Sequence, residues 1–194
     1  ECIVDVGKMT IDIVKFVETI NNTRNNENIS NKERREDMKN AFKVLAKSLM
    51  TYIPPALDWV REQVELYERS GGTEGTTLRD TGLPCIIVTH KGNKTAAIRK
   101  IALMRVETGG CYVLVGSYGG RPSNPVWVYN LRAHPDVEIR DKTEVFKMRV
   151  REVKDDAERA RLWELSADAF PPYNEYQAKT DRKIPIFIAE PAED

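Results

Sequence analysis

The chain has 194 residues, which is enough for one full domain and an appendage but not for two large domains. Hydrophobic residues make up 41% of it, a fraction that suits a packed globular core. The 30 basic and 30 acidic residues cancel, which argues against nucleic acid as the main partner, because binding phosphates requires an excess of positive charge on one face.

The spacing of the cysteines and the length of the apolar runs restrict the class of protein further. Cys2, Cys85 and Cys111 lie far apart and form no Cys-x-x-Cys pair, so neither a metal site nor a disulfide framework is expected, and a reducing cytoplasm is the predicted compartment. No apolar run approaches the ~20 residues of a membrane span, so any membrane association would be weak and peripheral.

Residues 1–53 differ in composition from the rest and predict a helical hairpin. Apolar residues recur every three or four positions from Val6 to Ile20 and again from Met38 to Leu49, and the polar stretch 21–30 between them reads as a loop. Ser30-Asn31-Lys32-Glu33 matches a capping box at the start of the second helix. Two helices cannot bury both apolar stripes alone, so we expect the hairpin to pack on the domain that follows, on a second copy of the chain or on another partner.

Residues 54–194 predict a second module, because Pro54 and Pro55 prevent a helix from running through. A helix from Ala56 ends at Gly71-Gly72, and short strands and turns follow it. The predicted strands are 83–90, 98–107, 111–117, 137–140, 145–153 and 184–189, with helices at 124–133 and 155–169. Short strands joined by hairpins favour an antiparallel barrel in an α+β fold over a doubly wound parallel sheet.

The first candidate motif is the turn from Gly92 to Lys100. It contains a glycine, the Thr95 hydroxyl and the cations Lys94, Arg99 and Lys100. Charged donors near backbone amides are suited to phosphate or carboxylate groups, although a basic hairpin turn is more often plain solvated surface.

The second candidate motif is the glycine-rich loop from Gly116 to Trp127. We expect Asn124 to cap the following helix and Pro125 to occupy its first position. Glycines allow a flat ring to lie against the backbone, and the amides at a helix start can receive an anionic or carbonyl-rich edge. An ordinary loop before a well-capped helix is the alternative interpretation.

The third candidate motif is the aromatic segment Phe170-Pro171-Pro172-Tyr173-Asn174-Glu175-Tyr176. Its rings could wall a substrate pocket and its phenols could donate hydrogen bonds, or the rings could simply pack a helix on the barrel. His90 and His134, the only histidines, are expected to be structural or surface residues.

Together and in this order, the three motifs resemble the deazaflavin-dependent nitroreductases of actinobacteria. The resemblance runs from about Leu57 to Pro191 and leaves residues 1–53 unmatched. Further matching segments are Arg61-Glu62-Gln63, Ser70-Gly71-Gly72-Thr73-Glu74-Gly75, Leu103-Met104-Arg105-Val106-Glu107, Asn124-Pro125-x-Trp127 and Thr180-Asp181-Arg182-x-Ile184-Pro185.

The resemblance implies a split β-barrel related to that of FMN-binding oxidoreductases, with flanking helices and coenzyme F-420 as cofactor. The phosphate and polyglutamate tail of the coenzyme would meet Asn93, Lys94, Thr95 and Arg99. The deazaflavin ring would lie near Leu103, Val115, Gly116, Gly119, Gly120, Asn124, Pro125, Val126 and Trp127. The acceptor would be lined by Met104, Ser117, Phe170, Tyr173 and Tyr176.

The chain departs from the family pattern around the cationic turn. Family members usually have glycine where this chain has Ala96, and many have proline where it has Ala102. Ile101 occupies a position that is often polar, and Phe170 replaces a frequent tyrosine. These changes bear on how tightly the coenzyme is held.

The implied function is hydride transfer from reduced F-420 to a small electron-poor planar molecule, such as a nitroaromatic, a quinone or an enone. Tyr173, Tyr176 or Ser117 would donate a hydrogen bond to the charge that develops on the acceptor. Two alternatives remain open: an FMN-dependent oxidoreductase on the same barrel, and a non-catalytic coenzyme-binding or fusion protein assembled through the N-terminal helices.

Overall fold

The computed structural model describes residues 17–18, 20–21, 30–79 and 81–192. The chain divides into two compact units, residues 1–54 and 55–194, which are considered separately. The helices are α2 (Asn31–Thr51), α3 (Asp58–Arg69), η1 (Tyr118–Gly120, a 3-10 turn), α4 (Val126–Ala133), α5 (Asp156–Ala169) and α6 (Pro172–Ala178). The strands are β1 (Cys85–Lys91), β2 (Ile98–Met104), β3 (Glu107–Thr108), β4 (Cys111–Val115), β5 (Asp136–Asp141), β6 (Glu144–Glu152) and β7 (Ile186–Pro191).

The first unit contains α2, whose predicted capping box is confirmed. The Ser30 hydroxyl accepts from the Glu33 amide at 3.3 Å, and the Glu33 carboxylate accepts from the Ser30 amide at 3.0 Å. Met38 and Phe42 are 47% and 63% exposed. The other predicted helix and the loop after it lie outside the described residues, apart from 17–18 and 20–21, which are helical.

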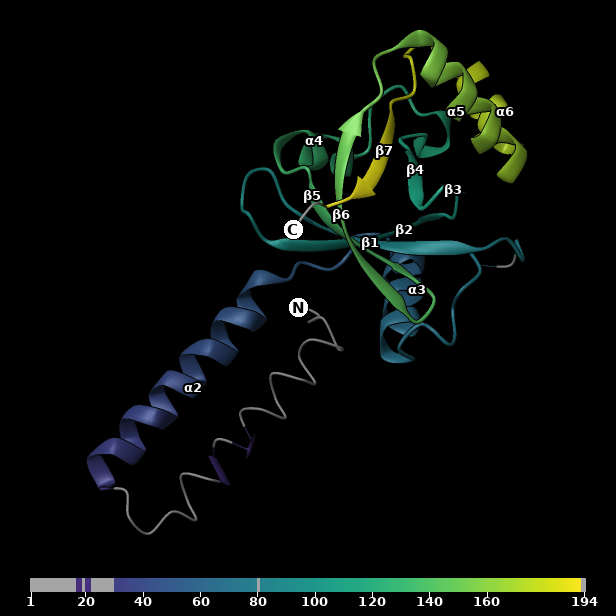
Figure 1. The fold of residues 1–194 in the computed structure, drawn as a ribbon. Helices are drawn as coiled ribbons and strands as arrows, with labels where there is room; N and C mark the ends of the chain where they lie inside the picture. Colours follow the sequence, from purple (N-terminus) through teal and green to yellow (C-terminus); the bar gives the residue numbers. More distant parts are fainter. Residues whose placement is uncertain (1–16, 19, 22–29, 80, 193–194) are drawn as a thin grey trace. The chain divides into compact units, whose positions relative to one another are not determined.

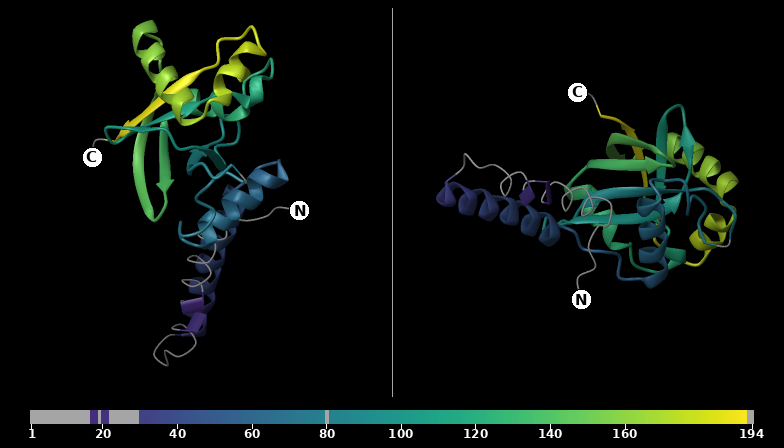
Figure 2. Two further views of the ribbon diagram at one scale, coloured as in Figure 1. Left: turned by 90° about the vertical axis from the view of Figure 1, so that its right-hand side faces the viewer. Right: turned by 90° about the horizontal axis from the view of Figure 1, so that it is seen from below.

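The second unit is built on one curled antiparallel sheet with strand order β2-β1-β5-β6-β7-β4-β3 (Figures 1 and 2). The short strand β3 follows β2 almost directly, and β2 contacts β4, so the two ends of the sheet approach each other. The predicted split β-barrel with flanking helices is therefore confirmed.

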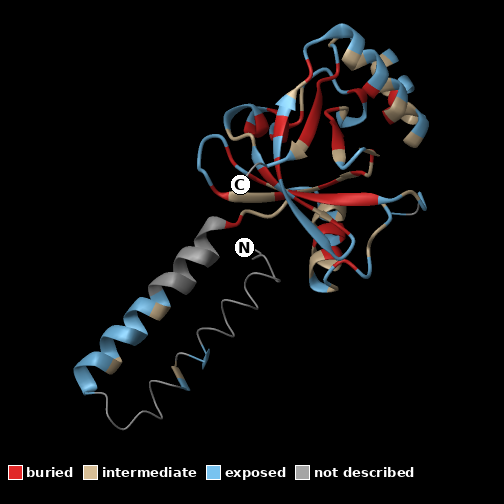
Figure 3. Cartoon of the chain, in the orientation of Figure 1, coloured by how far each residue is buried: buried red, intermediate tan, exposed pale blue. Residues whose placement is uncertain are grey.

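Strand β1 is buried on both faces, which explains its continuous apolar run. Ile86 and Val88 belong to a core cluster with α4, whereas Cys85 and Ile87 pack against α3. A further cluster joins β4 and β7 to α5 and α6, and Figure 3 shows these buried strands. Helices thus cover separate parts of the sheet.

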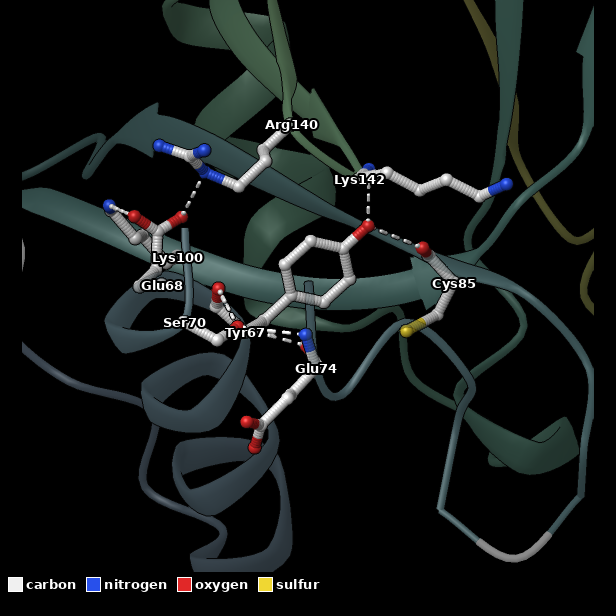
Figure 4. Close-up of polar contacts among 8 residues, drawn as sticks. All are labelled: Tyr67, Glu68, Ser70, Glu74, Cys85, Lys100, Arg140 and Lys142. Carbon is white, nitrogen blue, oxygen red and sulfur yellow. Dashed lines mark hydrogen bonds and ion pairs between the residues drawn. The ribbon is translucent and has the colours of Figure 1, made fainter. Parts of the chain in front are cut away.

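Helix α3 is fixed to the sheet by buried polar groups (Figure 4). The Tyr67 hydroxyl donates to the Cys85 carbonyl at 3.2 Å and accepts from the Lys142 amide at 2.6 Å. The Glu68 carboxylate lies 3.0 Å from Lys100 Nζ and 3.3 Å from Arg140 Nε, and its side chain is only 8% exposed. One turn of α3 therefore bridges β1, β2 and the β5–β6 hairpin.

Most predicted elements of this unit occur within a few residues of their expected bounds, and two differ. The predicted strand 98–107 is divided because it changes partner: it pairs with β1 as far as the bond from the Arg105 amide to the Pro84 carbonyl, and from Val106, whose carbonyl accepts from the Val113 amide, it pairs with β4. The aromatic segment forms helix α6, which Pro172 opens at a position where a missing amide hydrogen costs nothing. Among the described residues no helix is long and apolar enough to cross a membrane.

Candidate functional site

The cationic turn joins β1 to β2 and is closed by its own backbone. The Gly92 amide donates to the Ala97 carbonyl and the Ala96 amide to the Gly92 carbonyl, both at 2.8 Å. Lys94 and Thr95 are exposed and Arg99 is half-buried. No carboxylate of the described residues forms an ion pair with Lys94 or Arg99, so this turn presents net positive charge to an anionic group.

Ala96 has a φ of 53°, in the left-handed region that favours glycine. The family glycine at this position therefore reflects the shape of the turn. The turn of this chain keeps that shape with an alanine, at a cost in strain of about 1 kcal/mol.

Asn130 is a candidate site residue that the sequence did not indicate. Its Oδ1 accepts from the Asn93 amide at 2.9 Å, which ties the cationic turn to α4. The residue is 3% exposed, and its Nδ2 has no partner among the described residues. The feature of the sequence that could have pointed to Asn130 is its polar side chain among the apolar residues of a short helix. A buried donor without a partner is uncommon and indicates a group that a ligand or water completes.

His90 is buried in β1, which fits the structural role expected of it, although its Nε2 has no partner among the described residues. It is 2% exposed, and burial lowers the pKa of its imidazole to about 4, so the ring is neutral at physiological pH. It therefore offers no positive charge to the neighbouring turn.

The glycine-rich loop leaves β4 through a position that only glycine fits. A Cβ on Gly116 would lie 2.9 Å from both the Pro185 ring and a Val128 methyl group. The chain then reverses at Tyr118 and Gly119, with φ values of 49° and 64°, and the Gly120 amide donates to the Ser117 carbonyl at 3.0 Å. Ser117 is half-buried, and Tyr118 and Gly119 are exposed.

The prediction that Asn124 caps α4 is wrong. Pro125 occupies the cap position with extended backbone angles, rather than the first helical position, and no side chain caps the helix. The Asn124 Oδ1 instead accepts from Arg182 Nη1 at 2.8 Å. A charged guanidinium is a stronger donor than a helix amide, and so it takes this oxygen.

The residues predicted to meet the deazaflavin ring are buried to different degrees. Trp127 is 8% exposed and its ring lies 6.0 Å from that of Phe187, within the same core cluster that Leu103 borders. Val115 is also buried, whereas Val126 is 69% exposed. Trp127 therefore anchors the first turn of α4 in the core, whereas the neighbouring Val126 side chain is exposed.

The aromatic motif forms a cluster of rings on α5 and α6. Phe170 lies 5.0 Å from Tyr173 and 6.1 Å from Tyr176 between ring centroids. Tyr173 is 5% exposed, and burial raises the pKa of its phenol, so it stays protonated. Met104 is buried in the same cluster. Tyr176 is half-buried and is the more accessible of the two phenols.

These parts adjoin one another along the second unit. Asn130 joins the cationic turn to α4, the glycine-rich loop leads directly into α4, and α6 packs against η1 within that loop. A Cβ on Gly120 would lie 2.6 Å from the Tyr176 carbonyl oxygen, so the contact between loop and α6 is close. The structure therefore brings together cations, exposed backbone and aromatic rings, which suits a ligand with an anionic tail and a flat ring. The described residues contain no cluster of side chains that could hold a metal ion.

A cavity of about 410 Å³ lies elsewhere, between the β3–β4 turn and the β5–β6 hairpin. Within it Asp141 accepts from Arg105 Nε at 2.6 Å and from the Tyr112 hydroxyl at 2.8 Å. None of the predicted site residues lines this cavity, and these three polar groups satisfy one another, so we do not assign the site to it.

Comparison with known proteins identifies relatives over this second unit. The family model described as F420H(2)-dependent quinone reductase matches residues 59–191. An F420H(2)-dependent quinone reductase of Mycobacterium tuberculosis is 34% identical over 126 residues, which cover 63% of this chain and 83% of that protein.

Two solved structures are also similar to this chain. An F420-H2 dependent reductase, FDR-A, is 44% identical with a TM-score of 0.53, covering 55% of this chain and 94% of its own. A structure described as a domain-swapped dimer is 43% identical with a TM-score of 0.55, covering 69% of this chain and 98% of its own.

Proposed function

The chain belongs to the F420H(2)-dependent quinone reductase family, whose cofactor is F-420, and on that premise we propose that it reduces electron-poor planar acceptors such as quinones, nitroaromatics or enones. Residues 59–191 carry the family match, so we assign this activity to the second unit. Residues 1–53 are a separate helical module in this proposal.

The observation that carries the proposal is the unpaired positive charge of the cationic turn. Lys94 and Arg99 have no carboxylate partner among the described residues, and Thr95 adds an exposed hydroxyl. The phosphate and glutamate tail of F-420 would supply the missing negative charge. Asn130 Nδ2, buried and without a partner beside this turn, is a further donor for the coenzyme.

The acceptor would lie between the glycine-rich loop and α6. Reduced F-420 supplies a hydride when it is bound. The chain itself orients the acceptor against the coenzyme and provides hydrogen-bond donors, of which the Tyr176 phenol and the Ser117 hydroxyl are the accessible ones. Tyr173 is buried and fixes the ring cluster, so its contribution would come through Phe170 and Tyr176.

Equilibrium binding of F-420 and, separately, of FMN tests the proposal. We expect micromolar or tighter binding of F-420 and weak binding of FMN. The double variant Lys94→Ala/Arg99→Ala should lose at least about 2 kcal/mol of F-420 binding, roughly 30-fold, because charge-assisted hydrogen bonds contribute about 1.5–3 kcal/mol each.

Lys147→Ala/Arg149→Ala removes the same charge from exposed positions on β6 and serves as the control. Equal losses of F-420 affinity in both double variants would show that binding responds only to the net charge of the protein. That result would remove the cationic turn from the site. Tight binding of FMN alone would place the chain with flavin enzymes. Binding of neither cofactor would favour the non-catalytic alternative.

A further inference from the structure

Arg182 holds the glycine-rich loop from the inside. Its Nη2 donates to the carbonyls of Gly116 at 3.1 Å and Ser117 at 2.7 Å, and its Nε donates to the Arg121 carbonyl at 2.8 Å. Its Nη1 donates to the Asn124 side chain at 2.8 Å. A single guanidinium therefore fixes both ends of the loop from a segment 58 residues further along the chain.

All four acceptors are neutral oxygens. No carboxylate of the described residues pairs with Arg182, and partial burial lowers the pKa of its guanidinium. An arginine nevertheless remains charged in proteins. The loop is therefore wrapped around a positive charge that the protein does not neutralise.

The carbonyl contacts determine where the neighbouring amides point. In a planar trans peptide the N–H lies opposite the C=O, and the described chain has no cis peptide. The carbonyls of Gly116 and Ser117 face Arg182, so the amides of Ser117 and Tyr118 are directed away from it. Neither amide donates to any of the described residues.

The backbone at this point has the form of an anion-binding nest. Ser117 has right-handed helical angles and Tyr118 follows with a positive φ, a succession that turns consecutive amides toward one concave side. A non-glycine residue at positive φ costs free energy, and such strain gathers at functional positions. The four bonds from Arg182 fix the residues on either side of Tyr118, namely Gly116 and Ser117 before it and Arg121 after it. Arg121 in turn bonds to Tyr118, through its amide to the Tyr118 carbonyl at 3.3 Å and through Nη1 to the phenol at 3.0 Å.

We propose that Arg182 is a positioning residue that holds the Ser117 and Tyr118 amides as the binding site for an oxygen atom of the planar acceptor. The inference rests on the proposed function and adds a named oxygen site to it. Helix α6 packs against η1, so an acceptor held at these amides lies next to the aromatic cluster.

The chemistry of the acceptor explains why such a site is useful. A quinone that receives a hydride gains two electrons, and one of its oxygens carries a negative charge until a proton from solvent completes the hydroquinone. The coenzyme is oxidised by the same two electrons. Amides already aimed at that oxygen, with a positive charge behind them, stabilise the negative charge without having to reorganise.

Two variants of Arg182 test the inference in the full chain. Arg182→Met removes all four bonds, and Arg182→Lys keeps the charge but can make fewer bonds. Chymotrypsin cleavage after the exposed Tyr118 measures loop opening without coenzyme, and steady-state turnover with a soluble benzoquinone measures the oxygen site. Arg149→Met, at an exposed ion pair with Asp136, is the control.

We expect Arg182→Met to be cleaved at least about tenfold faster, and its kcat at saturating F-420 to fall roughly 100-fold, the loss typical of removing an oxyanion donor. Arg182→Lys should lie between Arg182→Met and wild type in both measurements. Unchanged cleavage or unchanged kcat in Arg182→Lys and Arg182→Met would overturn the inference, as would a loss confined to F-420 affinity. Failure of the wild type to bind F-420 would instead refute the proposed function, and cleavage would still report the role of Arg182 in the loop.

Discussion

At the scale of single residues, Ala96 stands where family members usually have glycine, and its backbone conformation is strained. Its φ of 53° is one that an alanine adopts only with strain. We predict that Ala96→Gly stabilises the protein by up to about 1 kcal/mol, because relief of the left-handed strain outweighs the greater freedom of glycine in the unfolded chain. Urea unfolding followed by tryptophan fluorescence measures this.

Ala97→Gly is the matched control for this prediction, since Ala97 is a neighbouring buried residue without a positive φ. It should destabilise the protein by roughly 0.5–1 kcal/mol or more. If Ala96→Gly were as destabilising as Ala97→Gly, the strain at position 96 would be disproved.

Single residues also show which parts of the candidate site could be predicted from sequence. Lys94, Thr95 and Arg99 could be assigned to the coenzyme only through the family resemblance, because a basic, glycine-containing turn is by itself more often solvated surface, and their role stays a prediction. Asn124 was misassigned because the guanidinium that takes its side chain comes from Arg182, far away in the chain. Asn130 was missed because its partner, the Asn93 amide, becomes a neighbour only when α4 packs on β1.

At the scale of elements, α3 is held by a buried carboxylate shared between two cations. We predict that Glu68→Gln lowers the free energy of unfolding by about 3–5 kcal/mol, because the buried Lys100 and the half-buried Arg140 both lose an ion pair with a buried carboxylate. Glu62→Gln, exposed on the same helix, should change stability by no more than about 0.5 kcal/mol. Similar urea midpoints for both variants would contradict this assignment.

Most of the helices and strands could be predicted from the sequence, because strand alternation, glycine turns and helix caps are local signals. Ser30 and Glu33 gave the start of α2, and Gly71 and Gly72 gave the end of α3, where both have positive φ. The break between β2 and β3 could not be predicted from the sequence, since it depends on the chain exchanging β1 for β4 as its pairing partner. Helix α6 was hidden by two prolines that open it.

At the scale of the whole molecule, the family match and the candidate site fall within residues 55–194, and the family model does not extend to α2. The strand order of the sheet is what brings the cationic turn, the glycine-rich loop and α6 into one region, although they are separated in sequence. That convergence could be inferred only through the family resemblance, because periodicity specifies strands but not their order.

We propose that residues 1–53 form an assembly module. Phe42 is 63% exposed and Met38 47% exposed on α2, and burying such side chains against a second copy would contribute about 1–3 kcal/mol each. The intact chain should therefore be a dimer or larger by size-exclusion chromatography with light scattering, and a chain beginning at Ala56 should assemble from fewer subunits.

Phe42→Glu should dissociate the intact assembly, whereas Lys39→Glu, at an exposed position of α2, should not. An identical oligomeric state for the intact chain, the shortened chain and Phe42→Glu would mean that these helices do not drive assembly, and any association would then belong to the reductase unit.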